Sequence, residues 1–246
     1  MFGFGEEKKV KKSVKLVRES GPAVANVSNT ILKQKFEAAG AALQAKGMQG
    51  IRAQAVCVLD FSGSMSGDYL SGEVQTLTER FLAFALQIDA DGEIPVIPFE
   101  SRRLPTINVN QNNFQGVIQR ELLDKHYMGS TNLAHALEEV RNIARTTDAP
   151  LFVGVVTDGN PDSISETTKI VCDLANYPVF IKFMALRDVP YLRELDDLDN
   201  TKRLLDNVDT KTFTSLNMTD GQFALAMAEE WDSWISAAQQ AGILTN

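Results

Sequence analysis

The sequence is poor in cysteine and has no long apolar run. Its 246 residues include two cysteines, Cys57 and Cys172, without the CxxC spacing of a metal site, and so few thiols exclude a disulfide framework. No apolar run approaches the roughly 18 residues of a membrane-spanning helix. The N-terminal residues lack the apolar region of a secretory signal. We therefore expect a cytoplasmic protein in which both cysteines are reduced.

Basic residues are in the minority. The chain has 24 Lys and Arg against 32 Asp and Glu, a net charge of −8, which argues against nucleic acid as a partner because nucleic-acid-binding domains carry a basic face. The first 20 residues differ, with six basic residues and three glutamates. We interpret residues 1–50 as a basic tail and a leader helix. The tail is expected to be solvated and flexible; the alternative is weak contact with an anionic membrane surface or an acidic partner.

Several catalytic motifs are absent. No G-x-x-x-x-G-K-[ST] loop occurs, which excludes a P-loop. The stretch from Gly63 to Gly67 does not match the G-x-S-x-G nucleophile elbow, and the only histidines are His126 and His135. A phosphotransfer aspartate of the haloacid-dehalogenase kind would need a second Asp where Ser62 stands. We therefore do not expect an enzyme.

Apolar strands alternate with amphipathic helices along the chain. Strands are predicted at residues 53–59, 94–99, 104–109, 151–156, 178–186 and 211–214. Helices are predicted at residues 29–46, 74–88, 113–124, 132–145, 163–176, 190–197 and 219–240. This alternation is typical of βαβ crossovers. The predicted fold is a doubly wound, Rossmann-like α/β domain over residues 51–246, with a mainly parallel central sheet, helices on both faces and an N-terminal leader helix.

Carboxylates and hydroxyls follow the strands of this predicted sheet. The candidate site residues are Asp60, Ser62, Ser64, Thr131 and Asp158. Ligands bind beyond the carboxyl ends of the strands in such sheets, and alternate residues of an extended segment point the same way, so these side chains are expected to converge. Two carboxylates and three hydroxyls, with no imidazole or thiolate, favour Mg²⁺, with Mn²⁺ or Ca²⁺ as alternatives. Helix capping is the simpler explanation of DFSGS taken alone.

The three segments together resemble a known family. D-x-S-x-S at residues 60–64, G-S-T at 129–131 and T-D-G at 157–159 are similar to the metal-ion-dependent adhesion site (MIDAS) of von Willebrand factor A (vWA) domains. The resemblance covers about residues 50–240, and all five positions of the pattern are intact. The runs "TDGNPDS", "VFIKFMALRD" and "LRELDDLDN" resemble the bacterial and phage-borne tellurium-resistance (Ter) vWA proteins, and more distantly the copines.

The resemblance implies a function and a ligand arrangement. It implies that Ser62, Ser64 and Thr131 are close ligands of the ion, and that Asp60 and Asp158 hold it largely through water. We expect a Mg²⁺-dependent protein-binding module of a cytoplasmic stress-response assembly, in which a partner's Asp or Glu completes the metal shell. The alternatives are a metal-independent scaffold and a metal-dependent phosphate-ester enzyme or enzyme subunit. An enzyme needs a general base or a positioned Arg. The three segments that carry the motif, residues 60–64, 129–131 and 157–159, are called the metal loops here, and they contain neither.

Four residues near the metal loops are expected to contact the partner. Met65 and Tyr69 follow the two serines and are expected to be exposed beside the ion. Met128 and Asn160 are expected to add specificity. Acidic runs elsewhere, including those that begin at Asp89 and Asp196, lack the order of an EF-hand loop and are interpreted as solvated turns.

Overall fold

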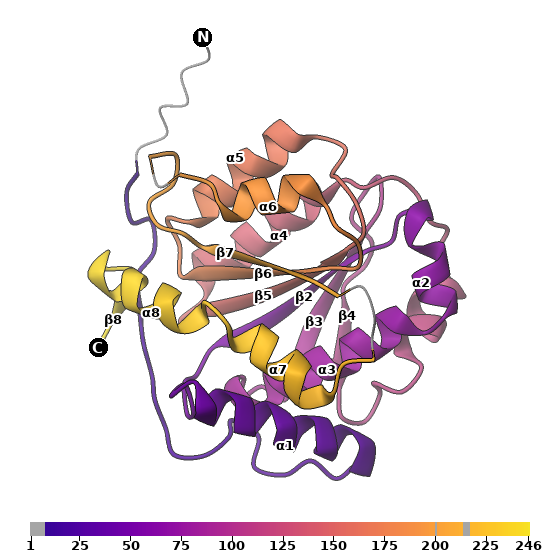
Figure 1. Cartoon of the computed structure of the whole chain (residues 1–246), viewed down its shortest axis with the longest axis horizontal. Helices are drawn as coiled ribbons and strands as arrows, with labels where there is room; N and C mark the ends of the chain where they lie inside the picture. The colour runs from indigo at the N-terminus through magenta and orange to yellow at the C-terminus, as the bar shows by residue number, and fades with distance from the viewer. Residues whose placement is uncertain (1–7, 200, 214–216) are drawn as a thin grey trace.

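A six-stranded sheet forms the centre of the molecule (Figure 1). The computed structural model describes residues 8–199, 201–213 and 217–246. The strands lie in the order β4-β3-β2-β5-β6-β7, and all neighbouring pairs are parallel except β3 and β4. The strands are β2 (Gln54–Asp60), β3 (Glu93–Phe99), β4 (Ile107–Asn110), β5 (Leu151–Thr157), β6 (Val179–Ala185) and β7 (Val208–Thr212). The predicted mainly parallel α/β sheet is confirmed.

Helices cover both faces of the sheet (Figure 1). One apolar core joins α1, α3, α7 and α8 to one face, and a second joins α4, α5 and α6 to the other. Because both faces are covered, every residue of β5 and β6 is buried. Among the described residues, no helix is both long and apolar enough to span a membrane. The helices are α1 (Thr30–Ala45), α2 (Ser66–Leu70), α3 (Glu73–Ile88), α4 (Leu133–Thr146), α5 (Ile164–Leu174), α6 (Pro190–Asp196), α7 (Asp220–Ala228) and α8 (Trp231–Gln240).

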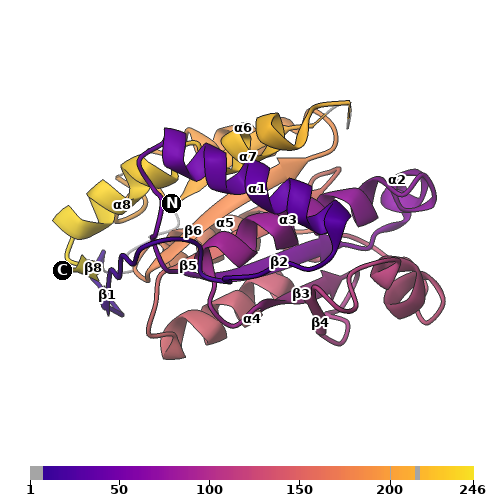
Figure 2. The same ribbon diagram turned by 90° about the horizontal axis from the view of Figure 1, so that it is seen from below.

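Helix α1 occupies the residues where the sequence predicts a leader helix. The side chain of Asn29 caps it by accepting hydrogen bonds from the amides of Ile31 and Leu32. Its apolar face, which includes Leu32 and Leu43, is buried in the core that it shares with α3 and α7. Figure 2 shows α1 lying across these two helices. The leader helix is therefore part of the packing that supports the sheet.

The N-terminal segment is packed against the rest of the protein. β1 (Val14–Lys15) pairs in parallel with β8 (Leu244–Thr245). Lys11 forms an ion pair with Asp173, next to the end of α5. The expectation of a flexible tail is therefore wrong for the described part of this segment, because its backbone is hydrogen-bonded to the folded domain. Most of its residues are exposed, as expected of a solvated segment. Residues 1–7 of the predicted tail lie outside the described residues.

The predicted C-terminal helix is two helices. The backbone is extended at Glu229 and left-handed at Glu230, where φ is 61°. A non-glycine residue rarely adopts that conformation, and it ends the regular helix. Lys182 of β6 donates a hydrogen bond to the Glu229 carbonyl at 3.0 Å. This contact between distant segments accounts for a break that helical periodicity does not reveal.

The edge of the sheet also differs from the prediction. The helix expected at residues 113–124 is a π-helical turn at Gln119–Leu123. The Asn113 side chain accepts from the Asn110 amide and donates to the Asn108 carbonyl, each at 2.8 Å. These bonds hold the chain in a turn against β4, so that a regular helix does not begin at residue 113.

Candidate metal-binding site

Asp60 lies at the carboxyl end of β2 and is fully buried. Its Oδ1 accepts a hydrogen bond from the Ser62 amide at 2.9 Å, and its Oδ2 accepts one from the Thr157 hydroxyl at 2.6 Å. Burial raises the pKa of Asp60 to about 6, against the lowering effect of these hydrogen bonds. A dication beside this carboxylate would favour its charged form.

The two serines connect Asp60 to the end of β5. Ser62 Oγ lies 3.1 Å from Ser64 Oγ, and Ser64 Oγ donates to Asp158 Oδ1 at 2.8 Å. A 3₁₀ turn at Gly63–Met65 follows Ser62 and brings the second serine back toward the strand ends. Four of the five predicted site residues therefore lie together at the carboxyl edge of the sheet.

The loop that carries Thr131 is joined to the first loop through the backbone. The Gly63 amide donates to the Gly129 carbonyl at 3.0 Å, and Gly129 in turn donates to the Phe61 carbonyl at 3.2 Å. A Cβ atom at position 129 would collide with the Glu100 carboxylate, so glycine permits this close approach. The Thr131 amide donates to Asp162 Oδ1 at 3.0 Å. The fifth predicted residue thus lies on a loop that is fixed beside the other four.

The donor set fits a hard divalent cation. Ser62, Ser64 and Asp158 are linked oxygen to oxygen at hydrogen-bond distance, and Asp60 is a buried carboxylate that accepts from the Ser62 amide. Carboxylates and hydroxyls suit Mg²⁺ or Mn²⁺, whereas soft transition metals prefer sulfur or imidazole. Asp60, Ser62, Ser64, Thr131 and Asp158 are therefore the residues that would hold an ion.

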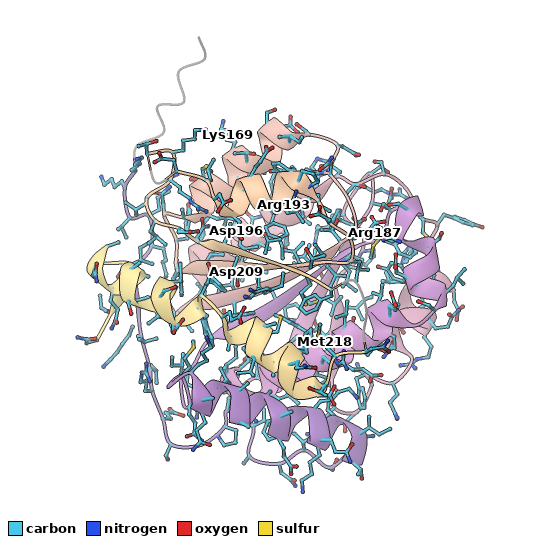
Figure 3. The ribbon with its side chains drawn as sticks, in the orientation of Figure 1. Lys169, Arg187, Arg193, Asp196, Asp209 and Met218 are labelled. Atoms are coloured by element: carbon cyan, nitrogen blue, oxygen red, sulfur yellow. The ribbon has the colours of Figure 1, made fainter. Side chains whose placement is uncertain are left out.

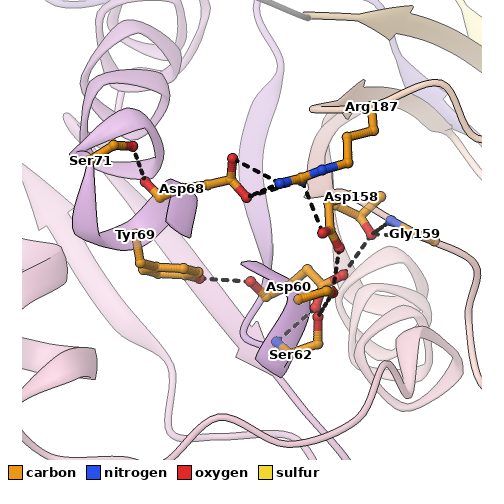
Figure 4. A network of polar contacts seen from close by, with 10 residues as sticks. Asp60, Ser62, Asp68, Tyr69, Ser71, Asp158, Gly159 and Arg187 are labelled. Carbon is orange, nitrogen blue, oxygen red and sulfur yellow. Dashed lines mark hydrogen bonds and ion pairs between the residues drawn. The ribbon is translucent and has the colours of Figure 1, made fainter. Parts of the chain in front are cut away.

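Arg187, a residue that was not predicted to belong to the site, enters it from a fourth segment. Its Nη1 lies 2.9 Å from Asp158 Oδ2 and 3.0 Å from Asp68 Oδ2, and its Nη2 lies 3.1 Å from the same Asp68 oxygen (Figure 4). The pKa of Arg187 is raised, chiefly by its hydrogen bonds to Asp68. A signal was present, because Arg187 follows β6 at the same carboxyl edge of the sheet. The three metal loops contain no arginine, but the fold brings one to them.

Two of the four residues expected to contact the partner are buried instead of exposed. Met65 is fully buried, and Tyr69 is buried with its hydroxyl donating to the Asp60 carbonyl at 2.8 Å. Their predicted exposure beside the ion is wrong, because this side of the 3₁₀ turn and α2 packs into the core, where the Tyr69 ring meets Phe61 edge-on at 5.2 Å. Met128 is partly buried against the same core, and Asn160 is exposed.

Other apolar side chains are exposed near these loops. The exposed fraction is 81% for Leu70, 95% for Tyr127 and 50% for Ile164. Leu70 ends α2, Tyr127 lies just before the Thr131 loop, and Ile164 begins the helix that follows the Asp158 loop. Each of the three metal loops therefore has one exposed large apolar side chain close to it in the sequence.

A second acidic group lies away from this site. In the described part of the chain, carboxylate oxygens of Asp196, Asp209 and Glu230 lie within 4.8 Å of one another. Lys182, which is fully buried, forms an ion pair with Asp209 and a hydrogen bond with the Glu229 carbonyl. This group therefore already contains a basic side chain.

Two acidic residues that were interpreted as part of solvated turns have structural roles. Asp89 is buried, and its Oδ2 accepts from the Ala55 amide at 2.8 Å. Asp196 is partly buried and accepts from the Thr210 amide at 3.2 Å. Burial raises the pKa of each carboxyl to about 6. The interpretation is wrong for both residues, because each carboxylate binds a backbone amide of another segment.

Comparison with known sequences supports the resemblance. The family model described as "vWA-TerF-like: vWA found in TerF C terminus" matches residues 52–244. The uncharacterized protein YcbR of Bacillus subtilis (strain 168) is 26% identical over 212 residues, which cover 82% of this chain and 85% of that protein. The family match spans the sheet and all three metal loops.

A solved structure shares the fold. The manganese-loaded TRAP protein of Plasmodium vivax superposes with a TM-score of 0.50 at 15% sequence identity, and the match covers 72% of each chain. At this identity the similarity concerns the architecture of the sheet and its helices.

Proposed function

The chain belongs to the vWA-TerF-like family, and on that premise we propose that it is a Mg²⁺-dependent module that binds a protein partner through its metal site. A partner's Asp or Glu side chain completes the shell of the ion. The observation that carries this proposal is the oxygen-only cluster in which Ser62, Ser64 and Asp158 are connected beside the buried Asp60.

The charges of the site suit an acidic ligand. When bound, a divalent ion would supply the positive charge that attracts a partner's carboxylate. Asp60 and Asp158 are the two carboxylates of the predicted ligand set, and one oxygen of Asp158 is already paired with Arg187. Asp68, which lies outside the predicted ligand set, also pairs with Arg187, so these four side chains together carry the charge that balances a dication. The attraction for a partner's carboxylate would therefore come from its direct contact with the ion. The manganese in the TRAP structure supports a divalent ion in a domain of this fold.

The exposed apolar side chains support a protein as the partner. Leu70, Tyr127 and Ile164 are each at least half exposed. Each lies close in the sequence to one of the metal loops, and exposed apolar residues around a binding site are typical of interaction surfaces. An acidic side chain of the partner would reach the ion while neighbouring parts of the partner cover these three residues.

The cellular setting is proposed from the family and the cysteines. A TerF-like vWA domain supports a role in a tellurium-resistance-like stress-response assembly. Cys57 is buried, and burial raises the pKa of its thiol well above its usual range, which makes it a poor nucleophile. Both cysteines are free, as expected of a cytoplasmic protein.

A phosphate-ester enzyme is the second candidate, and Arg187 is the observation that favours it. An arginine beside a metal site can stabilise a phosphoryl group. Two carboxylates already bind this guanidinium, however, and His135 bonds to Asn132 on α4. We therefore propose that the protein is not an enzyme. Hydrolysis of p-nitrophenyl phosphate by the wild type, but not by Asp60→Ala, in Mg²⁺ would overturn that view.

The proposed metal site is tested first by direct binding of the ion. Isothermal titration with Mg²⁺ compares the wild type with a Ser62→Ala/Ser64→Ala double variant. Ser66→Ala is the matched control, because Ser66 is an exposed hydroxyl two positions beyond the motif. The double variant is expected to lose binding while the control retains it. Unchanged Mg²⁺ affinity in the double variant would contradict the assignment of Ser62 and Ser64 as ligands of the ion.

Partner capture then tests the binding function. Wild type and Asp60→Ala are used as bait in host lysate, each in Mg²⁺ and in EDTA, after circular dichroism has shown that both are folded. The proposal expects a protein captured by the wild type in Mg²⁺ alone. Capture of the same proteins under all four conditions would favour a metal-independent scaffold.

A further inference from the structure

Arg187 forms an ion pair with one carboxylate oxygen of Asp158, a residue that is proposed to hold the metal ion. Its guanidinium contacts Asp158 Oδ2, whereas Asp158 Oδ1 accepts from Ser64 on the side of the predicted ligands. The Asp158 side chain is 4% exposed, and that of Arg187 is 49% exposed. The carboxylate is therefore held between a basic side chain and the hydroxyl cluster.

Asp68 is the second carboxylate that pairs with Arg187. Asp68 lies in α2, the helix that directly follows the metal loop, and its side chain is 11% exposed. Its two oxygens receive three of the four contacts that the guanidinium makes with the two aspartates. The guanidinium of Arg187 thus pairs both with Asp158, which belongs to the predicted ligand set, and with Asp68, which does not.

We propose that Arg187 is a positioning residue that competes with the metal ion for Asp158 and thereby lowers the affinity of the site for the free ion. This inference rests on the proposed metal-binding function. A guanidinium next to a ligand carboxylate repels a dication and also orients the carboxylate through a charge-assisted hydrogen bond. Asp68 moderates the repulsion because its negative charge lies beside the guanidinium and partly offsets the positive charge of Arg187.

A purely structural role for Arg187 makes a different prediction. If the arginine served only to hold α2 against the loop after β6, its removal would loosen the metal loop and weaken metal binding. Removal of Asp68 would break the same connection and would also weaken metal binding. Competition instead predicts effects of opposite sign for these two substitutions.

The experiment measures Mn²⁺ affinity, with free Mn²⁺ followed by electron paramagnetic resonance. Arg187→Gln is expected to tighten the dissociation constant on the order of tenfold, because a like charge beside the ion is removed. Asp68→Asn is expected to weaken it several-fold, and this effect should shrink in the Arg187→Gln background. Arg187→Lys keeps the charge and is expected to bind nearly as the wild type does.

Arg193→Gln is the matched control. Arg193 is an exposed arginine in α6, paired with Asp188, and its substitution should leave Mn²⁺ affinity unchanged. Weaker or unchanged binding by Arg187→Gln, with the variant folded by circular dichroism, would overturn the inference while leaving the metal site intact. Absence of Mn²⁺ binding by the wild type would overturn the proposed function and this inference together.

Discussion

Two groups of acidic side chains lie beside β6 and the loop that follows it, and each contains one basic side chain. Lys182, within β6, is paired with Asp209 and is fully buried. Arg187, two residues beyond the end of β6, is paired with Asp68 and Asp158 and has 49% of its side chain exposed. Figure 3 shows Asp196 and Asp209 well separated from Arg187.

The two basic side chains differ in exposure, and we expect only the exposed one to be replaceable by an ion from solvent. The side chains of Lys182 and Asp209 are both buried, and loss of the lysine would leave Asp209 charged and buried. Arg187 reaches its carboxylates from the solvent side, where ion pairs contribute little to stability. We therefore expect the first group to stabilise the fold and the second to bind ligands.

The largest expected effect comes from breaking the buried pair. Lys182→Met should lower the free energy of unfolding by about 3–5 kcal/mol, because removal of one partner leaves an uncompensated buried charge. Urea denaturation in EDTA measures the loss. Lys182→Met/Asp209→Leu should recover much of the stability, since both charges are then gone. A loss under about 1 kcal/mol in the single variant would show that the pair is not structurally important.

The second-largest expected effect is stabilisation of the folded state by an ion bound at the metal loops. A ligand at 100 times its dissociation constant stabilises the folded state by about 2.7 kcal/mol. Saturating Mg²⁺ should therefore raise the melting temperature of the wild type and of Ser66→Ala, but not that of Ser62→Ala/Ser64→Ala. Calorimetry with and without EDTA provides the measurement. An equal rise in all three proteins would place the stabilising ion elsewhere.

A smaller, pH-dependent effect is expected at Asp196. Burial, followed by the charge of Glu230, raises its pKa from 3.8 to about 6. The folded state then binds more protons than the unfolded state between these values, so the stability contributed by the protonated group is lost as pH rises through about 6. Asp196→Asn should gain about 1 kcal/mol over the wild type at pH 7.5 and little at pH 4.

Urea denaturation at the two pH values provides the test for Asp196. Asp197→Asn is the control, because Asp197 is its exposed neighbour. An equal gain for Asp196→Asn at both pH values would contradict the assignment of the effect to proton binding.

The smallest expected effect is that of Arg187→Gln on the metal-free protein. A half-exposed ion pair contributes about 0–1 kcal/mol, so its unfolding free energy in EDTA should change by less than that. The same denaturation series includes Lys182→Met, which makes the two basic residues directly comparable. A loss as large as that of Lys182→Met would remove the distinction between the two groups.

The sheet and the meeting of the metal loops were predictable from local pattern. Apolar runs such as residues 151–156 indicate strands covered on both faces, and parallel strands place their carboxyl ends at one edge. Asp60 and Ser62 follow from the alternation of an extended segment, whereas Ser64 is brought to them by the 3₁₀ turn at Gly63–Met65 and not by alternation. These predictions need only the order of elements along the chain.

Residues whose position depends on packing between distant segments were not predictable. Tyr69 lies four residues after Met65 on α2, and nothing in their spacing tells which side of that short helix meets Phe61. The link from Arg187 to Asp68 requires knowing where α2 lies relative to the end of β6. In each case the deciding contact joins residues from different elements.

The pairing of β1 with β8 bears on how the domain can be attached to a surface. The two short strands hold the first and last described segments side by side, and Figure 2 places them at the opposite end of the molecule from α2. A linker fused to the C-terminus therefore leaves the protein far from the metal loops. When immobilised through that end, the domain would present the carboxyl edge of its sheet, with the predicted metal loops, freely to solution.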